Sequence, residues 1–120
     1  MQVTKLDFVA VPSRDAERAS KFYGETLSLR PDGHSKYEFW AGETCLGIYE
    51  PERYGMTFAP QKCAHLALHV EDVEAARKEL EAKGVEFGGE VLDTGVCHMA
   101  FFEDPDGNAL MLHRRYAPYQ

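Results

Sequence analysis

The chain has 120 residues and a formal net charge of −7, from 13 basic and 20 acidic residues. This length predicts a single domain over residues 1–120, without a separate cofactor domain. The acidic balance argues against nucleic acid and membrane partners, because phosphate groups would be repelled. No segment approaches the roughly 18 apolar residues of a membrane span, and Lys5 and Asp7 interrupt any apolar leader. We therefore expect a cytoplasmic protein.

The three cysteines are far apart in sequence and odd in number: Cys45, Cys63 and Cys97. This spacing fits neither a zinc knuckle nor a complete set of disulfides, so reduced structural thiols are expected. Cys97 and His98 are neighbours and would point to opposite faces of a strand, which argues against a nucleophile and base pair. Cys63 and His65 would share a face, but a buried, inert thiol is the favoured interpretation.

An internal repeat organises the chain. Sliding the sequence by 57 positions places the apolar run 6–11 over the run 63–68. Identical residues then recur at the same offset: Asp15 and Asp72, Glu17 and Glu74, Ala19 and Ala76, and Lys21 and Lys78. Apolar residues in both segments have the spacing of one helix face, so each repeat is predicted to begin with a strand and a helix. Asp15 and Asp72 are the predicted N-caps, and Gly84 the predicted end of the second helix.

Short β-type runs follow each predicted helix. The expected strands are 27–30, 37–40 and 45–49 in the first repeat, and 85–87, 97–102 and 109–113 in the second. Turns are predicted at 31–33, 41–43, 88–89 and 104–107, the last with Pro at i+1 and Gly at i+3 as a type I turn prefers. Each half is thus predicted to be βαβββ, with module one over 3–50, a linker over 51–61 and module two over 62–116.

Two βαβββ halves in one chain resemble the vicinal oxygen chelate superfamily, which includes glyoxalase I, extradiol dioxygenases, fosfomycin resistance enzymes and bleomycin resistance proteins. The local marks are Phe22-Tyr23 followed by Leu27, and the segment 101–108, Phe-Phe-Glu-Asp-Pro-Asp-Gly-Asn, before the last strand. The resemblance covers nearly the whole chain. It implies an α+β fold in which two tandem βαβββ modules pair their mixed sheets into an open cup. Because this scaffold carries many activities, the fold leaves function open.

The resemblance also locates the positions that hold a divalent ion in metal-dependent members, and they are Phe8, Gly47, His65 and Met111 in this chain. Phenylalanine has no lone pair to donate, glycine has no side chain, and a thioether is unsuited to Mn, Fe, Ni or Zn. A catalytic site needs about three protein ligands. These positions therefore imply that no metal cofactor is used.

A displaced metal site is the alternative. His113 shares a strand face with Met111, so His65, His113 and Glu50 would together supply three ligands if the strand end turned Glu50 inward. The simpler interpretation of His65 is a partly buried ring that bonds a hydroxyl or carbonyl group.

The lining of the expected cup is the candidate ligand site. Its predicted residues are Phe8, Trp40, Gly47, Tyr49, Tyr54, Phe58, His65, Met111 and His113. An aromatic and apolar lining suits a planar ligand held by burial and stacking. We therefore expect metal-independent sequestration of a small aromatic or cationic molecule, as in the bleomycin resistance group, by a homodimer that covers apolar strand surface.

Two other functions remain open at this point. One is an enzyme of the superfamily, a glyoxalase-like lyase or isomerase or a dioxygenase, with a displaced or absent metal site. The other is a protein whose cup is filled by Phe8 and Met111 and which acts by association.

Overall fold

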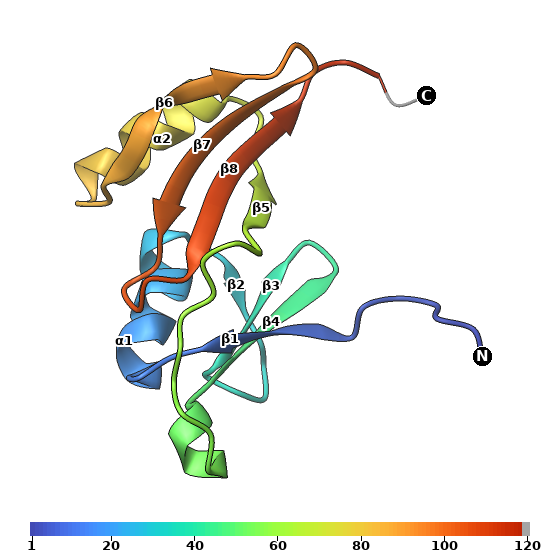
Figure 1. Ribbon diagram of the computed structural model, residues 1–120, viewed down its shortest axis with the longest axis vertical. Helices are drawn as coiled ribbons and strands as arrows, with labels where there is room; N and C mark the ends of the chain where they lie inside the picture. Colours follow the sequence, from blue (N-terminus) through green and yellow to red (C-terminus); the bar gives the residue numbers. More distant parts are fainter. Residues whose placement is uncertain (119–120) are drawn as a thin grey trace. The chain divides into compact units, whose positions relative to one another are not determined.

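Each half of the chain forms one four-stranded sheet that combines parallel and antiparallel pairing (Figure 1). The computed structural model describes residues 1–118, and the chain divides into two units, Met1–Pro60 and Gln61–Gln120. The predicted α+β class with two βαβββ repeats is confirmed. The pairing of the two sheets into a cup stays a prediction. Within residues 1–118, no helix is long and apolar enough to cross a membrane.

The first unit follows the predicted order of elements. It contains β1 (Phe8–Pro12), α1 (Ala16–Lys21), a π-helical turn (Phe22–Thr26), β2 (Arg30–Pro31), β3 (Glu38–Ala41), β4 (Thr44–Tyr49) and a 3-10 turn (Pro51–Tyr54). The strand order is β1-β4-β3-β2. Strand β1 runs parallel to β4, as the crossover through α1 requires, and the other pairs are antiparallel.

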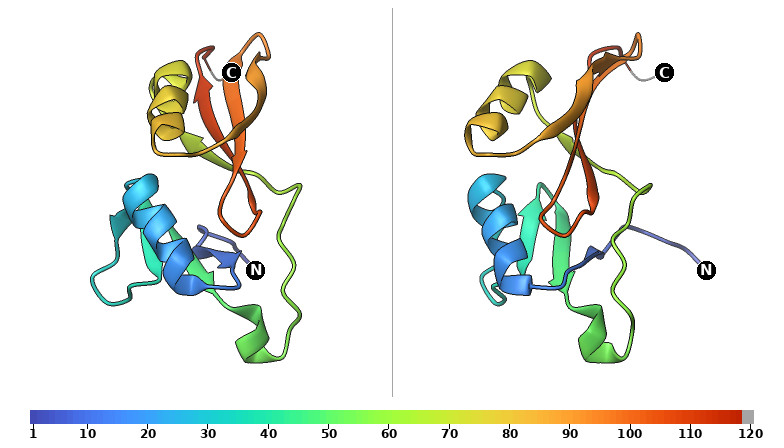
Figure 2. Two further views of the ribbon diagram at one scale, coloured as in Figure 1. Left: turned by 90° about the vertical axis from the view of Figure 1, so that its left-hand side faces the viewer. Right: turned by 60° about the vertical axis from the view of Figure 1, so that its left-hand side comes forward.

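The second unit repeats this arrangement. It contains β5 (Leu66–His69), α2 (Val73–Ala82), β6 (Phe87–Asp93), β7 (Cys97–Glu103) and β8 (Ala109–Arg115). The strand order β5-β8-β7-β6 corresponds strand for strand to the first unit, with β5 parallel to β8. Helix α2 packs against β6, β7 and β8 and covers one face of this sheet (Figure 2).

The predicted helix ends are confirmed. The Asp15 carboxylate accepts a hydrogen bond from the Arg18 amide, and the Asp72 carboxylate accepts one from the Ala75 amide. Both helices are therefore capped by a side chain that also suits the positive end of the helix dipole. Gly84 has φ +94°, a conformation that glycine adopts without strain, and follows the last turn of α2.

The core of each unit lies between its helix and its sheet. In the first unit Ala16, Ala19 and Tyr23 are buried, as their helical spacing predicts. Gly24 brings the π-helical turn close to β3, because a Cβ atom at Gly24 would lie 2.9 Å from Cε1 of buried Phe39. In the second unit the buried strand residues facing α2 are Ala100, Phe102, Leu110 and Leu112.

Two predicted strands begin too early. Strand β1 starts at Phe8 rather than residue 6, because its partner β4 begins at Thr44 and the register pairs Phe8 with Cys45. Strand β5 starts at Leu66 rather than residue 63, because the backbone before it turns around Gln61, whose side chain accepts a hydrogen bond from the Ala64 amide. Cys63, predicted to be buried, therefore lies before the strand and is exposed.

Three further predictions of local structure were wrong. The strand predicted over 27–30 is reduced to β2, because Leu27 still bonds the helix at Phe22 and Ser28 has φ +57°. The strand predicted over 85–87 is β6, which begins at Phe87 and runs through the predicted 88–89 turn. Gly89, at φ +70°, instead lies where the pairing with β7 shifts register, as in a β-bulge.

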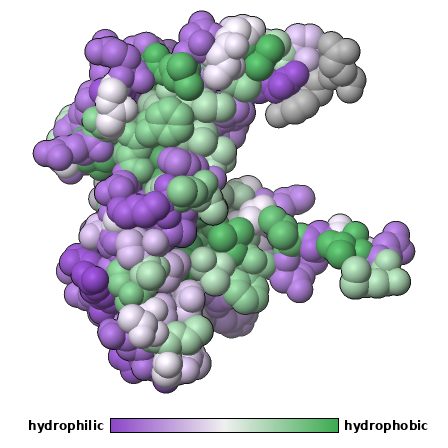
Figure 3. Space-filling view, viewed as in Figure 1, coloured by the Kyte–Doolittle hydropathy of each residue, from purple (hydrophilic) through white to green (hydrophobic). Residues whose placement is uncertain are grey.

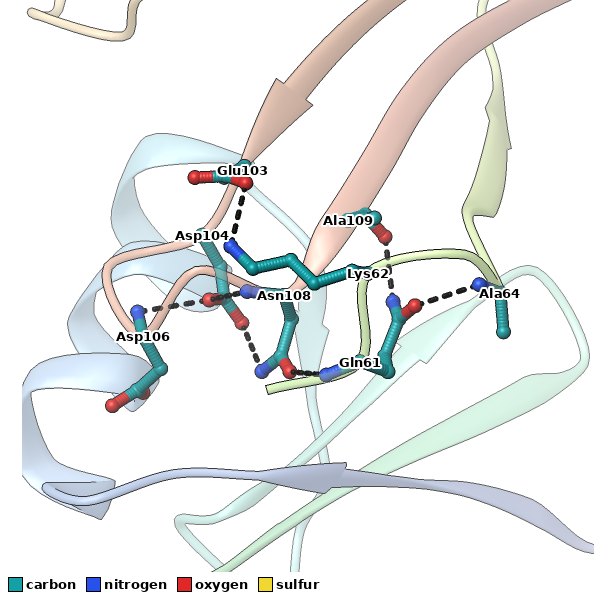
Figure 4. Close-up of polar contacts among 8 residues, drawn as sticks. All are labelled: Gln61, Lys62, Ala64, Glu103, Asp104, Asp106, Asn108 and Ala109. Carbon is teal, nitrogen blue, oxygen red and sulfur yellow. Dashed lines mark hydrogen bonds and ion pairs between the residues drawn. The ribbon is translucent and has the colours of Figure 1, made fainter. Parts of the chain in front are cut away.

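The turn at 104–107 is confirmed, with a hydrogen bond from the Gly107 amide to the Asp104 carbonyl (3.0 Å). The buried Asp104 carboxylate accepts hydrogen bonds from the amides of Asp106 and Asn108 and from the Asn108 side chain (Figure 4). Asn108 in turn accepts from the Gln61 amide, and the Gln61 side chain donates to the Ala109 carbonyl. This network ties the segment entering β5 to the start of β8.

Candidate functional site

The face of the first sheet that lies opposite α1 carries most of the candidate residues. Residues paired across neighbouring strands share a face. The register therefore forms one row of Phe8, Cys45, Trp40 and Arg30 and a second row of Ala10, Gly47 and Glu38. Tyr49 lies on the same face, two residues beyond Gly47. The opposite face holds the buried core residues Val11, Phe39, Leu46 and Ile48.

Phe8 is the most exposed large side chain on this face, at 60%. Its ring leans over Gly47, since a Cβ atom at Gly47 would lie 3.6 Å from Cδ2 of Phe8. Because Gly47 has no side chain, the Phe8 ring from β1 can lie over β4, the strand between β1 and β3. Phe8 therefore presents an accessible aromatic surface next to Glu38.

Trp40 is held in place by its neighbours. Its indole Nε1 donates to Oδ1 of Asp32 at 3.0 Å, and this bond is the main reason that the pKa of Asp32 lies below its ordinary value. The Arg30 guanidinium lies over the Trp40 ring, 5.6 Å from its centre. Two contacts from the sheet's edge therefore fix the orientation of this indole.

Glu38, which is not among the residues predicted from the sequence, also lies on this face. Its carboxylate accepts a weak hydrogen bond from the buried Cys45 thiol, with 3.8 Å between Sγ and Oε1. Burial, and then the nearby Glu38 charge, raise the pKa of Cys45. The signal that could have located Glu38 is its two-residue spacing from Trp40, which places both on one strand face.

The remaining aromatic candidates of the first unit lie in different surroundings. Tyr49 and Tyr54 approach each other with 6.4 Å between ring centres, and Tyr54 is exposed on the 3-10 turn. Phe58 is buried, and the Arg14 guanidinium lies over its ring at 4.7 Å. Phe58 is thus covered in this structure, and its role as a wall of the ligand site stays a prediction.

The second sheet has a corresponding face opposite α2. Met111 pairs directly with Phe101, and the His65 ring meets the edge of Phe101 with 5.5 Å between centres. Phe101, which the sequence analysis used only as part of a motif, therefore joins His65 and Met111 into one half-buried cluster. His113 lies in the next row, between His69 and Met99.

These two faces belong to a fold that comparisons with known proteins identify. The family model of the Glyoxalase/Bleomycin resistance protein/Dioxygenase superfamily matches residues 5–112. The chain belongs to this superfamily. No curated protein sequence matches it significantly.

Among solved structures, the chain is similar to TnmS3, an antibiotic binding protein from Streptomyces. The two are 26% identical with a TM-score of 0.74, covering 96% of this chain and 98% of that chain. A putative glyoxalase family protein from Bacillus anthracis is 24% identical, with a TM-score of 0.76 over 96% of this chain and 98% of that one. A superfamily member from Sphaerobacter thermophilus is 21% identical, with a TM-score of 0.77 over 92% and 97%. The last two likenesses concern the fold alone.

The side chains at the four positions that the resemblance implies for a metal do not fit a divalent ion. Phe8 and Gly47, adjacent on the first sheet, offer no donor, and the Phe8 ring fills the space beside Gly47. On the second sheet His65 has one imidazole, while the thioether of Met111 is a soft ligand. Within residues 1–118, no three His, Cys, Asp or Glu side chains are grouped to hold a metal ion.

Glu50, the third ligand of the displaced site considered above, has another role. Its Oε2 accepts a hydrogen bond from the Ala16 amide at 2.9 Å, and its Oε1 pairs with Arg53. The Ala16 amide, followed by Arg53, lowers the pKa of Glu50. The carboxylate thus neutralises the N-terminal end of α1 instead of turning toward the candidate ligand face.

We expect Glu50→Gln to lower the melting temperature by more at neutral pH than at pH 3. A carboxyl group whose pKa is lowered by folding stabilises the protein above its unfolded-state pKa, about 4.3, and this stabilisation is lost as the pH falls. Thermal melts of both proteins at pH 7 and pH 3 measure the difference. Glu52→Gln, an exposed neighbour, is the matched control. An equal difference at both pH values would contradict this role for Glu50.

Proposed function

We propose that this superfamily member binds and sequesters a small aromatic molecule without using a metal ion. The observation that carries the proposal is the accessible Phe8 ring over Gly47, on the same sheet face as the fixed indole of Trp40. Aromatic rings on an uncovered sheet face offer stacking and burial to a planar ligand. An antibiotic binding protein among the similar structures supports the same class of function.

The side chains around this face favour binding over catalysis. Burial raises the pKa of the Cys45 thiol, so this thiol is a poor nucleophile at neutral pH. The positions that bind metal in enzymes of the superfamily carry Phe8, Gly47 and Met111. An aromatic lining with few polar groups is typical of a site that recognises shape.

A fluorescence titration tests the proposal, because Trp40 is the single tryptophan of the chain. Planar heteroaromatic antibiotics and metabolites should change its emission saturably, and the bound molecule should be recovered chemically unchanged. Tryptophan amide alone corrects for absorption by the probe. Added Mn, Zn, Ni or Fe should change neither affinity nor melting temperature, whereas an ion at a hundredfold excess over its Kd would add about 2.7 kcal/mol. Turnover of a bound molecule, or stabilisation by a metal, would contradict the proposal.

We also propose that the protein is a homodimer. The segment leading into β1 exposes hydrophobic side chains, with Val3 at 75% and Leu6 at 66%, and the hydropathy surface shows green atoms along it (Figure 3). Strand β1 is moreover an edge of its sheet, with unpaired backbone groups. A second copy would cover both features. Sedimentation at micromolar concentration should give twice the 13.5 kDa chain mass, and a purely monomeric species would refute the dimer.

A further inference from the structure

Glu38 is an acidic residue on the face of the first sheet that lies opposite α1, which we call the ligand face. The residue is half-buried and lies opposite Gly47. Among residues 1–118, no Lys, Arg or His forms an ion pair with it, and its side chain bonds only the Cys45 thiol. A thiol is a weak donor. This carboxylate can therefore accept a charge-assisted hydrogen bond from a cation that is not part of the first unit.

The register shows what surrounds this carboxylate. Cys45, toward which Oε1 of Glu38 points, lies in the row between Phe8 and Trp40. The Phe8 ring reaches over Gly47, the residue directly opposite Glu38. One negative group is therefore bordered by an aromatic side chain from β1 and by another from β3.

Arg30, the basic residue in the neighbouring row of this face, is held at Trp40. Arg30 pairs with Trp40 on the side of the sheet away from Cys45, and its guanidinium lies over the indole ring. Asp32 fixes the indole nitrogen from the same side. Arg30 and Asp32 therefore position Trp40. A cationic group of a bound ligand can then pair with the carboxylate of Glu38.

We propose that Glu38, Phe8 and Trp40 form a recognition site for an organic cation, namely an ammonium or amidinium group attached to an aromatic body. The carboxylate pairs with the charge, and the faces of the two rings attract the same charge through their negative electrostatic potential. The net charge of −7 attracts such a ligand from a distance. This inference rests on the proposed function and specifies the class of molecule bound.

A matched pair of small probes tests the assignment. 2-Phenylethylammonium and 2-phenylethanol share the same ring and chain length, but only the first is charged. Trp40 fluorescence reports binding of either probe. We expect the ammonium to bind about tenfold more tightly at low ionic strength, with the preference shrinking as salt is added. The isosteric variant Glu38→Gln should abolish the preference and keep or raise the melting temperature, because it removes an unpaired charge. Glu90→Gln, at an exposed site in the second unit, makes the same charge change and should retain the preference.

The outcomes separate this inference from the proposed function. If both probes bind equally to the unaltered protein, or if Glu38→Gln keeps the preference, Glu38 is not the cation anchor and the aromatic site stands. If neither probe binds, both the anchor and the aromatic site are wrong. A melting temperature that falls strongly in Glu38→Gln would assign the residue a structural role instead.

Discussion

Replacing Asp104 by alanine should lower the free energy of unfolding by about 3 kcal/mol or more, because hydrogen bonds to a buried charged group contribute roughly 1.5–3 kcal/mol each and do not add fully. Asp104 is only 5% exposed, and its carboxylate accepts from the amides of Asp106 and Asn108 and from the Asn108 side chain. Alanine would leave these buried donors unsatisfied. The substitution would also weaken the hydrogen bond between the Gln61 amide and the Asn108 side chain, which holds the segment before β5.

Glu103→Ala is the matched control, since it removes the adjacent carboxylate. Glu103 forms an exposed ion pair with Lys62 at 2.8 Å, and exposed pairs contribute about 0–1 kcal/mol. Urea unfolding of both variants measures the difference. Asp104→Asn should give an intermediate loss, because one oxygen remains to accept the two amides while its nitrogen meets the Asn108 side-chain donor. Equal losses for Asp104→Ala and Glu103→Ala would contradict the proposed importance of the network.

The fold was predictable where local chemistry and the repeat agreed. The repeated Asp15 and Asp72 predicted both helix starts, and the Pro-Asp-Gly sequence predicted the turn before β8. The errors occur where the backbone conformation depends on how a strand pairs with its neighbours in the sheet. The bulge at Gly89 is such a case, because a pair of glycines indicates a turn or a bulge equally well until the pairing strand is known.

The site was predictable only in part, for a similar reason. Phe8, Gly47, His65 and Met111 were placed by the resemblance alone, and their role in a ligand site stays a prediction. The structure places Phe8, Gly47 and Met111 in strands β1, β4 and β8, and His65 directly before β5. The spacing of Glu38 from Trp40 indicates a shared strand face, but only the register places Glu38 opposite Gly47 and Phe101 opposite Met111. Cross-strand pairing joins residues far apart in sequence, so a single sequence without its register does not show it.

Phe8→Ala and Phe39→Ala should separate binding from stability within one sheet. The two phenylalanines lie on opposite faces, with Phe8 60% exposed and Phe39 4% exposed. Truncating Phe39 removes core packing against the helical turn at Gly24 and should cost about 3–5 kcal/mol. Truncating Phe8 removes little buried area and should cost less than about 1 kcal/mol. Thermal melts should therefore differ by roughly 10 °C or more between the variants.

Ligand affinity should be reduced more by Phe8→Ala than by Phe39→Ala, the reverse of their effects on stability. If the aromatic face binds ligand, Phe8→Ala loses a stacking surface and should weaken the binding of an aromatic probe about tenfold or more. Folded Phe39→Ala, measured well below its melting temperature, should keep most of its affinity, because its side chain faces α1 rather than the ligand. A third variant, Phe8→Leu, should recover the burial of ligand surface but not ring stacking. Its affinity for the probe should therefore lie between those of Phe8→Ala and the unaltered protein. A large loss of stability in Phe8→Ala, with unchanged probe binding, would instead make Phe8 a core residue and favour a protein whose binding face is filled.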